Sequence, residues 1–158
     1  MILIAYDGSV DAQAAIDHAG ELLKGQPVTV LTVWERLVDV VTRTGAGMAV
    51  GEVDYDRLDR SSLEQARERA KEGAERAQRA GLKPTARTSV REHSIAATIL
   101  AQAEDVGASA ILMGSRGLTG FKSLLLGSVS HGVLQHADRP VIVVPSPEVA
   151  AARAAHRR

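Results

Sequence analysis

The sequence predicts an α/β fold: one doubly wound parallel sheet of five strands with helices on both faces. Short runs that are apolar without a break, such as Met1–Tyr6 and Val28–Trp34, are typical of strands buried on both faces. Segments with helical spacing separate these runs, and such alternation favours a parallel sheet. Four aromatic residues in 158 leave the core to Val, Ile, Leu and Ala, which suits strands covered by helices.

The first half of the chain begins with a strand over Met1–Tyr6, which Asp7-Gly8-Ser9 interrupts. Ser9 is a suitable N-cap for the amphipathic helix that follows and that stops at Gly25-Gln26-Pro27. Val28–Trp34 is rich in β-branched residues and predicts the second strand. From Leu37 to about Asp54 no clean period is found, and its Gly-rich part predicts a mobile loop.

The second half continues the alternation of helices and strands. It predicts a charged, Ala-rich helix over Tyr55–Ala80, an edge strand over Pro84–Val90, a helix capped by Ser94, a buried strand over Ser109–Met113, a helix over Ser128–His136 and a last strand over Val141–Val144. We expect one domain over residues 1–146 and a flexible, frayed tail over residues 147–158.

Composition excludes several classes of function. The formal net charge is zero, so no overall field favours nucleic acid or an anionic membrane as a partner. Cysteine is absent, which excludes disulfides, zinc–thiolate sites and thiol catalysis. No apolar run approaches the roughly 20 residues of a membrane-spanning helix. The N-terminus lacks the features of a signal peptide, and we therefore predict a cytoplasmic protein.

Two loops stand where parallel sheets bind their ligands, beyond the carboxyl ends of the strands. Asp7-Gly8-Ser9 follows the first strand, and Gly114-Ser115-Arg116-Gly117 follows the fourth. If these two strands are neighbours, both loops line one crevice. That juxtaposition is the central structural hypothesis.

The segment Gly114–Ser130 has the features of a phosphate site. Its first two glycines have no Cβ and let a ligand approach the backbone. A helix begins at Gly127-Ser128, and a helix N-terminus offers unpaired N–H groups and a positive dipole end to phosphate oxygens. Hydroxyls and positive charge are added by Ser128, Ser130, Arg116 and Lys122. Taken singly, each glycine is best interpreted as a turn residue and each serine as a helix cap. The strand–loop–helix arrangement of all of them favours a phosphate-binding site.

Two other phosphate motifs do not fit. Gly120-Phe121-Lys122-Ser123 is not the end of a P-loop, because Phe121 separates the glycine from the lysine. The glycines of Gly45–Gly51 are spaced one residue too widely for a dinucleotide fingerprint and do not open a helix after a strand.

The pattern Gly114-x-x-Gly117, nine residues, Gly127-Ser128 resembles the G-2x-G-9x-G-[ST] motif of the ATP-binding members of the universal stress protein family. The opening ILIAYDGS and the later RPVIVVP are also similar to that family, and the resemblance extends from Met1 to about Pro145. It implies a sheet of order 3-2-1-4-5, as in the adenine nucleotide alpha hydrolase-like fold. It also implies a homodimer formed through Val141–Val144.

The resemblance also implies roles for individual residues. Asp7 would reach the ribose side of an adenosine, the backbone of Val33 would meet adenine, and Met113 and Gly114 would flank the ribose. The phosphates would be surrounded by Gly117, Gly127, Ser128, Val129 through its backbone, and Ser130. Arg116 stands where many members have histidine, which alters the expected phosphate contacts.

The leading hypothesis is an ATP-binding regulatory or stress-response protein. ATP is expected alone or with Mg²⁺, and ADP, AMP and cyclic AMP remain open. A slow ATPase is an alternative, and the lack of an evident catalytic base or metal-binding carboxylate counts against it. An interaction module that needs no nucleotide is a further alternative. Asp7 also admits a reading as a Mg²⁺ ligand or as a residue of the turn into the first helix. His18, His131 and His136 lack metal-ligand spacing, and no metal site is assigned.

Overall fold

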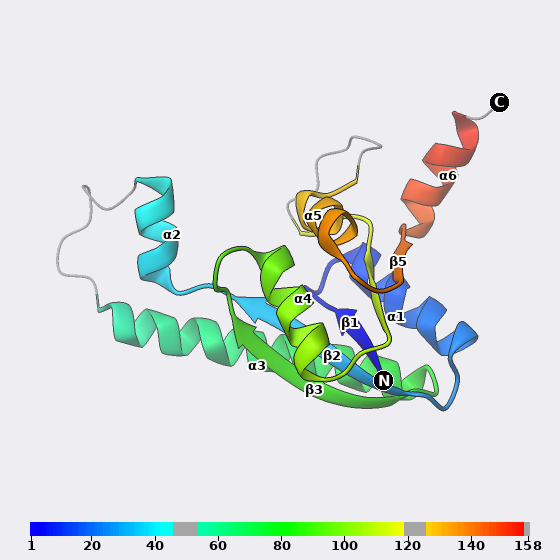
Figure 1. The fold of residues 1–158 in the computed structure, drawn as a ribbon, viewed down its shortest axis with the longest axis horizontal. Coiled ribbons are helices and arrows are strands. Elements are labelled where there is room, and N and C mark those ends of the chain that lie inside the picture. The colour runs from blue at the N-terminus through cyan, green and yellow to red at the C-terminus, as the bar shows by residue number, and fades with distance from the viewer. Residues whose placement is uncertain (46–53, 119–125, 157–158) are drawn as a thin grey trace.

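The computed structural model describes residues 1–45, 54–118 and 126–156. Its centre is one sheet of five parallel strands in the order β3-β2-β1-β4-β5 (Figure 1), so the predicted fold class and strand order are confirmed. In chain order the strands are β1 (Ile2–Ala5), β2 (Pro27–Trp34), β3 (Lys83–Val90), β4 (Ala110–Gly114) and β5 (Val141–Val144). The first and fourth strands are therefore neighbours, with Ala5 of β1 opposite Met113 of β4.

The helices are α1 (Val10–Leu22), α2 (Leu37–Thr44), α3 (Tyr55–Arg79), α4 (Ile95–Asp105), α5 (Ser128–His136) and α6 (Pro147–Ala155). Four of them, α1, α3, α4 and α5, cover the two faces of the sheet. One core joins α1 and α3 to the face that carries Ile4 and Val30. A second core joins α4 and α5 to the opposite face, which carries Leu3 and Ile111.

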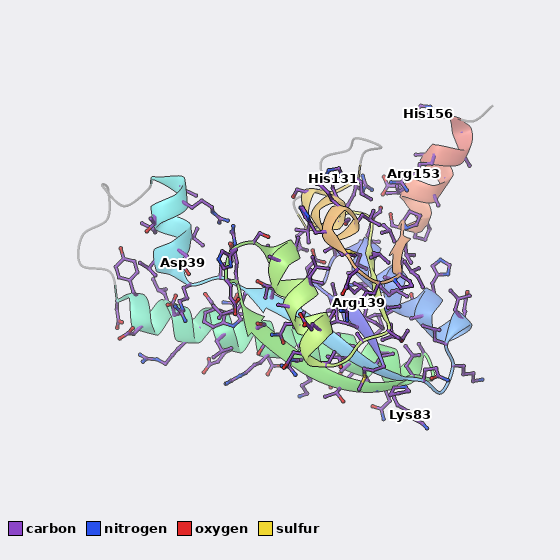
Figure 2. The ribbon with its side chains drawn as sticks, in the orientation of Figure 1. Asp39, Lys83, His131, Arg139, Arg153 and His156 are labelled. Atoms are coloured by element: carbon purple, nitrogen blue, oxygen red, sulfur yellow. The ribbon has the colours of Figure 1, made fainter. Side chains whose placement is uncertain are left out.

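The predicted caps set where the helices begin. The hydroxyl of Ser9 accepts a hydrogen bond from the N–H of Ala12 at the start of α1. Ser94 does the same for Ala97 at the start of α4. At the other end of α4, the Arg139 guanidinium (labelled in Figure 2) donates to the carbonyl oxygens of Ala103 and Ala108 at 3.0 and 2.8 Å. These bonds satisfy backbone groups that a helix leaves unpaired at its ends.

Helix α3 lies close to β2 and β3 because its buried residues are small. Ala66, Ala70, Gly73 and Ala77 form the stripe that faces the sheet. A Cβ on Gly73 would lie 2.7 Å from Cδ1 of Tyr6, so no larger residue fits at this separation. The sequence predicted an Ala-rich helix, and the structure shows that Gly73 belongs to its buried stripe.

Two predicted irregular segments contain helices instead. The expected mobile loop over Leu37–Asp54 begins with α2, which ends at Gly45 with a positive φ of 71°. The N–H of Leu37 donates to the Asp59 carboxylate on α3 at 2.7 Å, and such a long-range contact is invisible in a local pattern. Residues 46–53, the rest of the predicted loop, lie outside the described residues.

The expected frayed tail is the other correction, because residues 147–155 form α6 beyond β5 (Figure 1). The hydroxyl of Ser146 caps the N–H of Val149, and Pro147 occupies the first turn, where it lacks only an N–H that would be unpaired. The side chain of Val149 is 2% exposed. Packing at the first turn thus stabilises a helix in an Ala-rich segment. Within the described residues, no helix has the length and apolarity needed to cross a membrane.

Candidate functional site

The two loops that follow β1 and β4 are joined by hydrogen bonds. The N–H of Leu118 donates to Oδ2 of Asp7 at 3.2 Å, and the Ser9 hydroxyl donates to the carbonyl of Arg116 at 3.3 Å. The other Asp7 oxygen, Oδ1, accepts from the N–H of Ser9 at 3.0 Å. The crevice predicted from strand adjacency is therefore formed, and Asp7 holds its two sides together.

A buried carboxylate that sequence reasoning missed fixes the second loop. Asp11, 5% exposed, accepts from the Ser115 hydroxyl at 2.6 Å and from the N–H of Arg116 at 3.0 Å. Nε of Arg116 lies 3.8 Å from the same oxygen. Asp11 therefore neutralises positive charge and orients the backbone immediately after β4. The spacing of four residues from Asp7 gives no hint of this partner across the sheet.

The glycines of the motif serve contacts within the protein. A Cβ on Gly114 would lie 2.7 Å from the backbone nitrogen of Ala12, so its absence lets α1 approach the end of β4. A Cβ on Gly117 would lie 2.7 Å from Oδ2 of Asp7, and one on Gly127 would lie 3.3 Å from the carbonyl oxygen of Ser115. We expected Gly114 and Gly117 to admit a ligand. In the structure, the lack of a side chain at Gly114 leaves space for α1, and the lack of one at Gly117 leaves space for the Asp7 carboxylate.

The N-terminus of α5 is the part of the site with unused donors. Its N-cap, Gly127, has no side chain to cap the helix, and its own N–H donates to Ser115 at 2.8 Å. The N–H groups of Ser128, Val129 and Ser130 find no acceptor among the residues that the structure describes. Three donors and a positive dipole end therefore remain for an anion.

The hydroxyl of Ser130 does not point into the site as expected. The side chain is 3% exposed and donates to the carbonyl of Gly114 at 2.9 Å, with the carbonyl of Ser115 at 3.3 Å. It thereby fastens α5 to the end of β4, while Ser128 is exposed at the first position of the helix.

A cavity of about 700 Å³ lies beyond the carboxyl ends of β1, β2 and β4, and we call it the edge cavity. Every residue assigned to the site from the sequence lines it: Asp7, Val33, Met113, Gly114, Arg116, Gly117 and the four residues of Gly127–Ser130. One wall is apolar, where Val33 and Met113 meet Ile95 and Ile99 of α4. The cavity thus pairs an apolar wall with the polar N-terminus of α5.

Three further polar or charged side chains in the lining were not predicted. Tyr6, 2% exposed, donates its hydroxyl to Oε1 of Glu72 at 2.9 Å; burial, followed by this hydrogen bond, raises the pKa of Tyr6 to about 12. Glu35, two residues beyond Val33, forms ion pairs with Arg43 and Arg91. Arg69 reaches the cavity from the middle of α3, the helix predicted as charged and Ala-rich.

Metal-ligating side chains do not gather in the described parts of the chain: no group of three or more His, Asp or Glu is placed to hold an ion. Lys122, the cation proposed beside Arg116, lies outside the described residues. The residues present fit an anionic ligand through the α5 N-terminus, and the apolar wall fits a flat apolar or aromatic group.

Comparisons with known proteins identify the family and the fold. The model of the universal stress protein family matches residues 1–145. Universal stress protein YxiE of Bacillus subtilis strain 168 is 32% identical over 145 residues, which cover 90% of this chain and 97% of that protein. The solved structure of MJ0577, from Methanocaldococcus jannaschii, is 27% identical with a TM-score of 0.71, covering 91% of this chain and 94% of the other.

Two more distant solved structures show the same fold and carry ligands. The universal stress protein of Archaeoglobus fulgidus in complex with dAMP is 24% identical, with a TM-score of 0.60 and coverage of 90% of this chain and 95% of that one. A universal stress protein in complex with cAMP is 20% identical, with a TM-score of 0.57 and coverage of 92% and 95%.

Proposed function

We propose a function for this chain from one premise: it belongs to the universal stress protein family. In this proposal the chain is a nucleotide-dependent regulatory protein of the stress response, and it holds an adenine nucleotide in the edge cavity. ATP is the favoured ligand, alone or with Mg²⁺, because the spaced glycine pattern resembles the motif of ATP-binding members. The phosphates lie at the α5 N-terminus and the adenosine lies against the apolar wall.

The observation that carries the proposal is the open N-terminus of α5. In four other helices a backbone N–H of the first turn donates to the side chain of the N-cap residue: Ser9, Asp54, Ser94 and Ser146. Helix α5 starts at a glycine instead and keeps its first donors directed at a cavity. Phosphate oxygens are the natural partners of such donors, since they accept several hydrogen bonds and carry negative charge.

The adenosine end is supported by the opposite wall. Val33, Met113 and Ile99 offer apolar contact to a purine ring. Asp7 already accepts two backbone hydrogen bonds, but each carboxylate oxygen has a second lone pair and can accept from a ribose hydroxyl. Relatives in complex with dAMP and cAMP support the adenine class of ligand, while the choice among ATP, ADP, AMP and cyclic AMP rests on the motif.

The proposal includes a cytoplasmic homodimer. Strand β5 is an edge of the sheet, and its residues are apolar and mostly half-buried. An apolar edge strand with unpaired backbone groups calls for cover, and a second copy of the same strand provides it.

A charge reversal at the start of α5 tests the phosphate site. Ser128→Glu places a carboxylate at the first position of the helix, where it interacts favourably with the dipole and so preserves the fold. The same carboxylate competes for the free N–H groups and repels phosphate. We expect the affinity for ATP, measured by isothermal titration calorimetry, to fall about tenfold or more.

Ser128→Gln is the matched control, because it has the same size without the charge, and we expect it to keep most of the affinity. Equal affinities for ATP in both variants would contradict the phosphate assignment. Native mass spectrometry of the purified protein identifies which nucleotide it retains, and a flavin or no adenine nucleotide at all would count against the proposal.

A further inference from the structure

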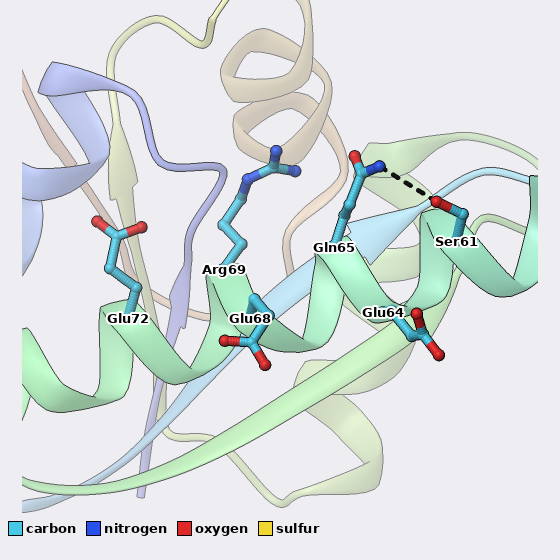
Figure 3. A pocket seen from close by; sticks show the side chains of 6 residues that line it. All are labelled: Ser61, Glu64, Gln65, Glu68, Arg69 and Glu72. Atoms are coloured by element: carbon cyan, nitrogen blue, oxygen red, sulfur yellow. Dashed lines mark hydrogen bonds between the residues drawn. The ribbon is translucent and has the colours of Figure 1, made fainter.

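A cation reaches the edge cavity from the opposite side of the sheet. Arg69 belongs to α3, which covers the face shared with α1, whereas α4 and α5 cover the other face. Its side chain nevertheless lines the edge cavity together with Asp7, Gly117 and Ser128. Figure 3 shows it leaving α3 toward the loop that follows β1, beside a shallow groove along the helix.

The loop after β1 fixes the path of this side chain. Gly8 has a positive φ of 83°, and a Cβ there would lie 3.4 Å from Nε and 3.5 Å from Cδ of Arg69. The guanidinium therefore passes directly over the backbone of Gly8 and is half-buried at that point. A long side chain packed in this way is ordered before any ligand arrives, which lowers the entropic cost of a contact.

The charge of Arg69 has no counterpart in the described part of the chain. No hydrogen bond or ion pair joins it to any described residue, whereas Arg76, Arg91 and Arg139 pair with Asp17, Glu35 and Asp138. The acidic neighbours on α3 do not serve it: Glu72 accepts from Tyr6, and Glu64 and Glu68 point away from it in Figure 3. A half-buried guanidinium without a carboxylate partner is costly unless an anion completes it.

The other charged residues that line the cavity already have partners. Glu35 is balanced by Arg43 and Arg91, and Arg116 lies beside Asp11. Both oxygens of Asp7 accept backbone hydrogen bonds. Among the charged residues in the described lining of the cavity, Arg69 is thus the one without a hydrogen bond or ion pair to another described residue.

We propose that Arg69 binds the phosphate chain of the nucleotide, so that the anion is held between α3 and the α5 N-terminus. The proposal rests on the proposed function. It adds to the phosphate site a cation from α3, a helix that lies outside the spaced glycine motif. A guanidinium suits this role because its planar fork donates two parallel hydrogen bonds to phosphate oxygens.

The test compares ATP with adenosine, which has the same base and sugar but no phosphate. In Arg69→Gln we expect the calorimetric affinity for ATP to fall about tenfold or more and the affinity for adenosine to stay unchanged. Arg69→Lys keeps a charge without the fork and should give an intermediate affinity for ATP. Arg67→Gln is the matched control, because Arg67 is exposed on the same helix and does not line the cavity.

Three results would overturn the inference. Unchanged ATP affinity in Arg69→Gln, with Ser128→Glu still impaired, would leave the proposed function standing and remove Arg69 from it. An equal loss for adenosine would place Arg69 on the base or the sugar. Failure of the unmodified protein to bind either ligand would overturn the proposed function itself, and this inference with it.

Discussion

At the scale of single residues, the site is held by carboxylates that bind backbone. Asp7 links the two loops of the crevice through Leu118, and Asp11 orients the first residues after β4 through Ser115 and Arg116. Both side chains therefore determine where the glycine loop lies before any ligand is bound. Asp7 also lines the edge cavity, whereas Asp11 acts through the loop.

We predict that Asp11→Ala lowers the free energy of unfolding by about 1–3 kcal/mol, because it leaves the buried hydroxyl of Ser115 and the N–H of Arg116 without an acceptor. Urea unfolding measures the loss. Asp11→Asn keeps an acceptor oxygen and should lose less. Asp17→Ala is the surface comparison: it breaks an exposed ion pair with Arg76 and should cost about 1 kcal/mol at most. Equal losses for Asp11→Ala and Asp17→Ala would contradict the role given to Asp11.

At the scale of elements, the distance between α3 and the sheet determines whether the Arg69 side chain reaches the edge cavity. The small residues of α3 let it lie against Tyr6 and Val30, and this close packing brings Arg69 over Gly8. A helix held farther from the sheet would carry its guanidinium away from the cavity. The stripe of alanines and Gly73 thus contributes to the proposed ligand site without touching it.

We predict that Gly73→Ala destabilises the protein, although glycine to alanine inside a helix normally stabilises it by up to about 1 kcal/mol. The added Cβ would lie 2.7 Å from Tyr6 and 2.9 Å from Val30, and overpacking of this kind costs about 1–3 kcal/mol. Chemical denaturation followed by circular dichroism gives the change. The control Gln78→Ala, at an exposed position of α3, should stay within about 0.5 kcal/mol of the parent. A more stable Gly73→Ala variant would show that α3 can move outward without cost.

At the scale of the whole molecule, the sheet order sets which strands end at the edge cavity and which strand is left at the edge of the sheet. Strands β1, β2 and β4 end at the cavity, while β5 leaves one side of its backbone unpaired by the described strands. Ile111 and Ser115 donate to the carbonyls of Pro140 and Val144. Since backbone groups alternate along a parallel strand, those of Val141 and Val143 face away from the sheet.

We predict that Val143→Pro weakens the proposed homodimer and leaves the fold intact. Proline removes the outward N–H of Val143, and edge strands tolerate proline where that group faces solvent. A two-fold dimer loses this donor twice, so its dissociation constant should rise about tenfold or more. Sedimentation velocity across a range of concentrations measures it, with Val143→Ala as the control that keeps the N–H. A monomeric parent protein, or an unaltered dimer in Val143→Pro, would contradict assembly through β5.

Local patterns predicted the elements that depend on local causes. The apolar runs became strands, and Ser9 and Ser94 became helix caps, because side-chain burial and capping act over a few residues. The same reasoning failed for α2 and α6. There, the hydrogen bond from Leu37 to Asp59 and the burial of Val149 stabilise the helices, and neither contact can be seen in a local pattern.

The sequence by itself determined the alternation of strands and helices, the two loops at the ends of β1 and β4, and the spaced glycines that point to a nucleotide. These features are set by residue type and short spacing. The tertiary structure alone decided which side chains complete the site. Arg69 and Glu35 reach the edge cavity, and Asp11 reaches Ser115, only after distant segments pack against one another. Contacts of this kind depend on how closely helices approach the sheet, and no periodicity along the chain encodes that distance.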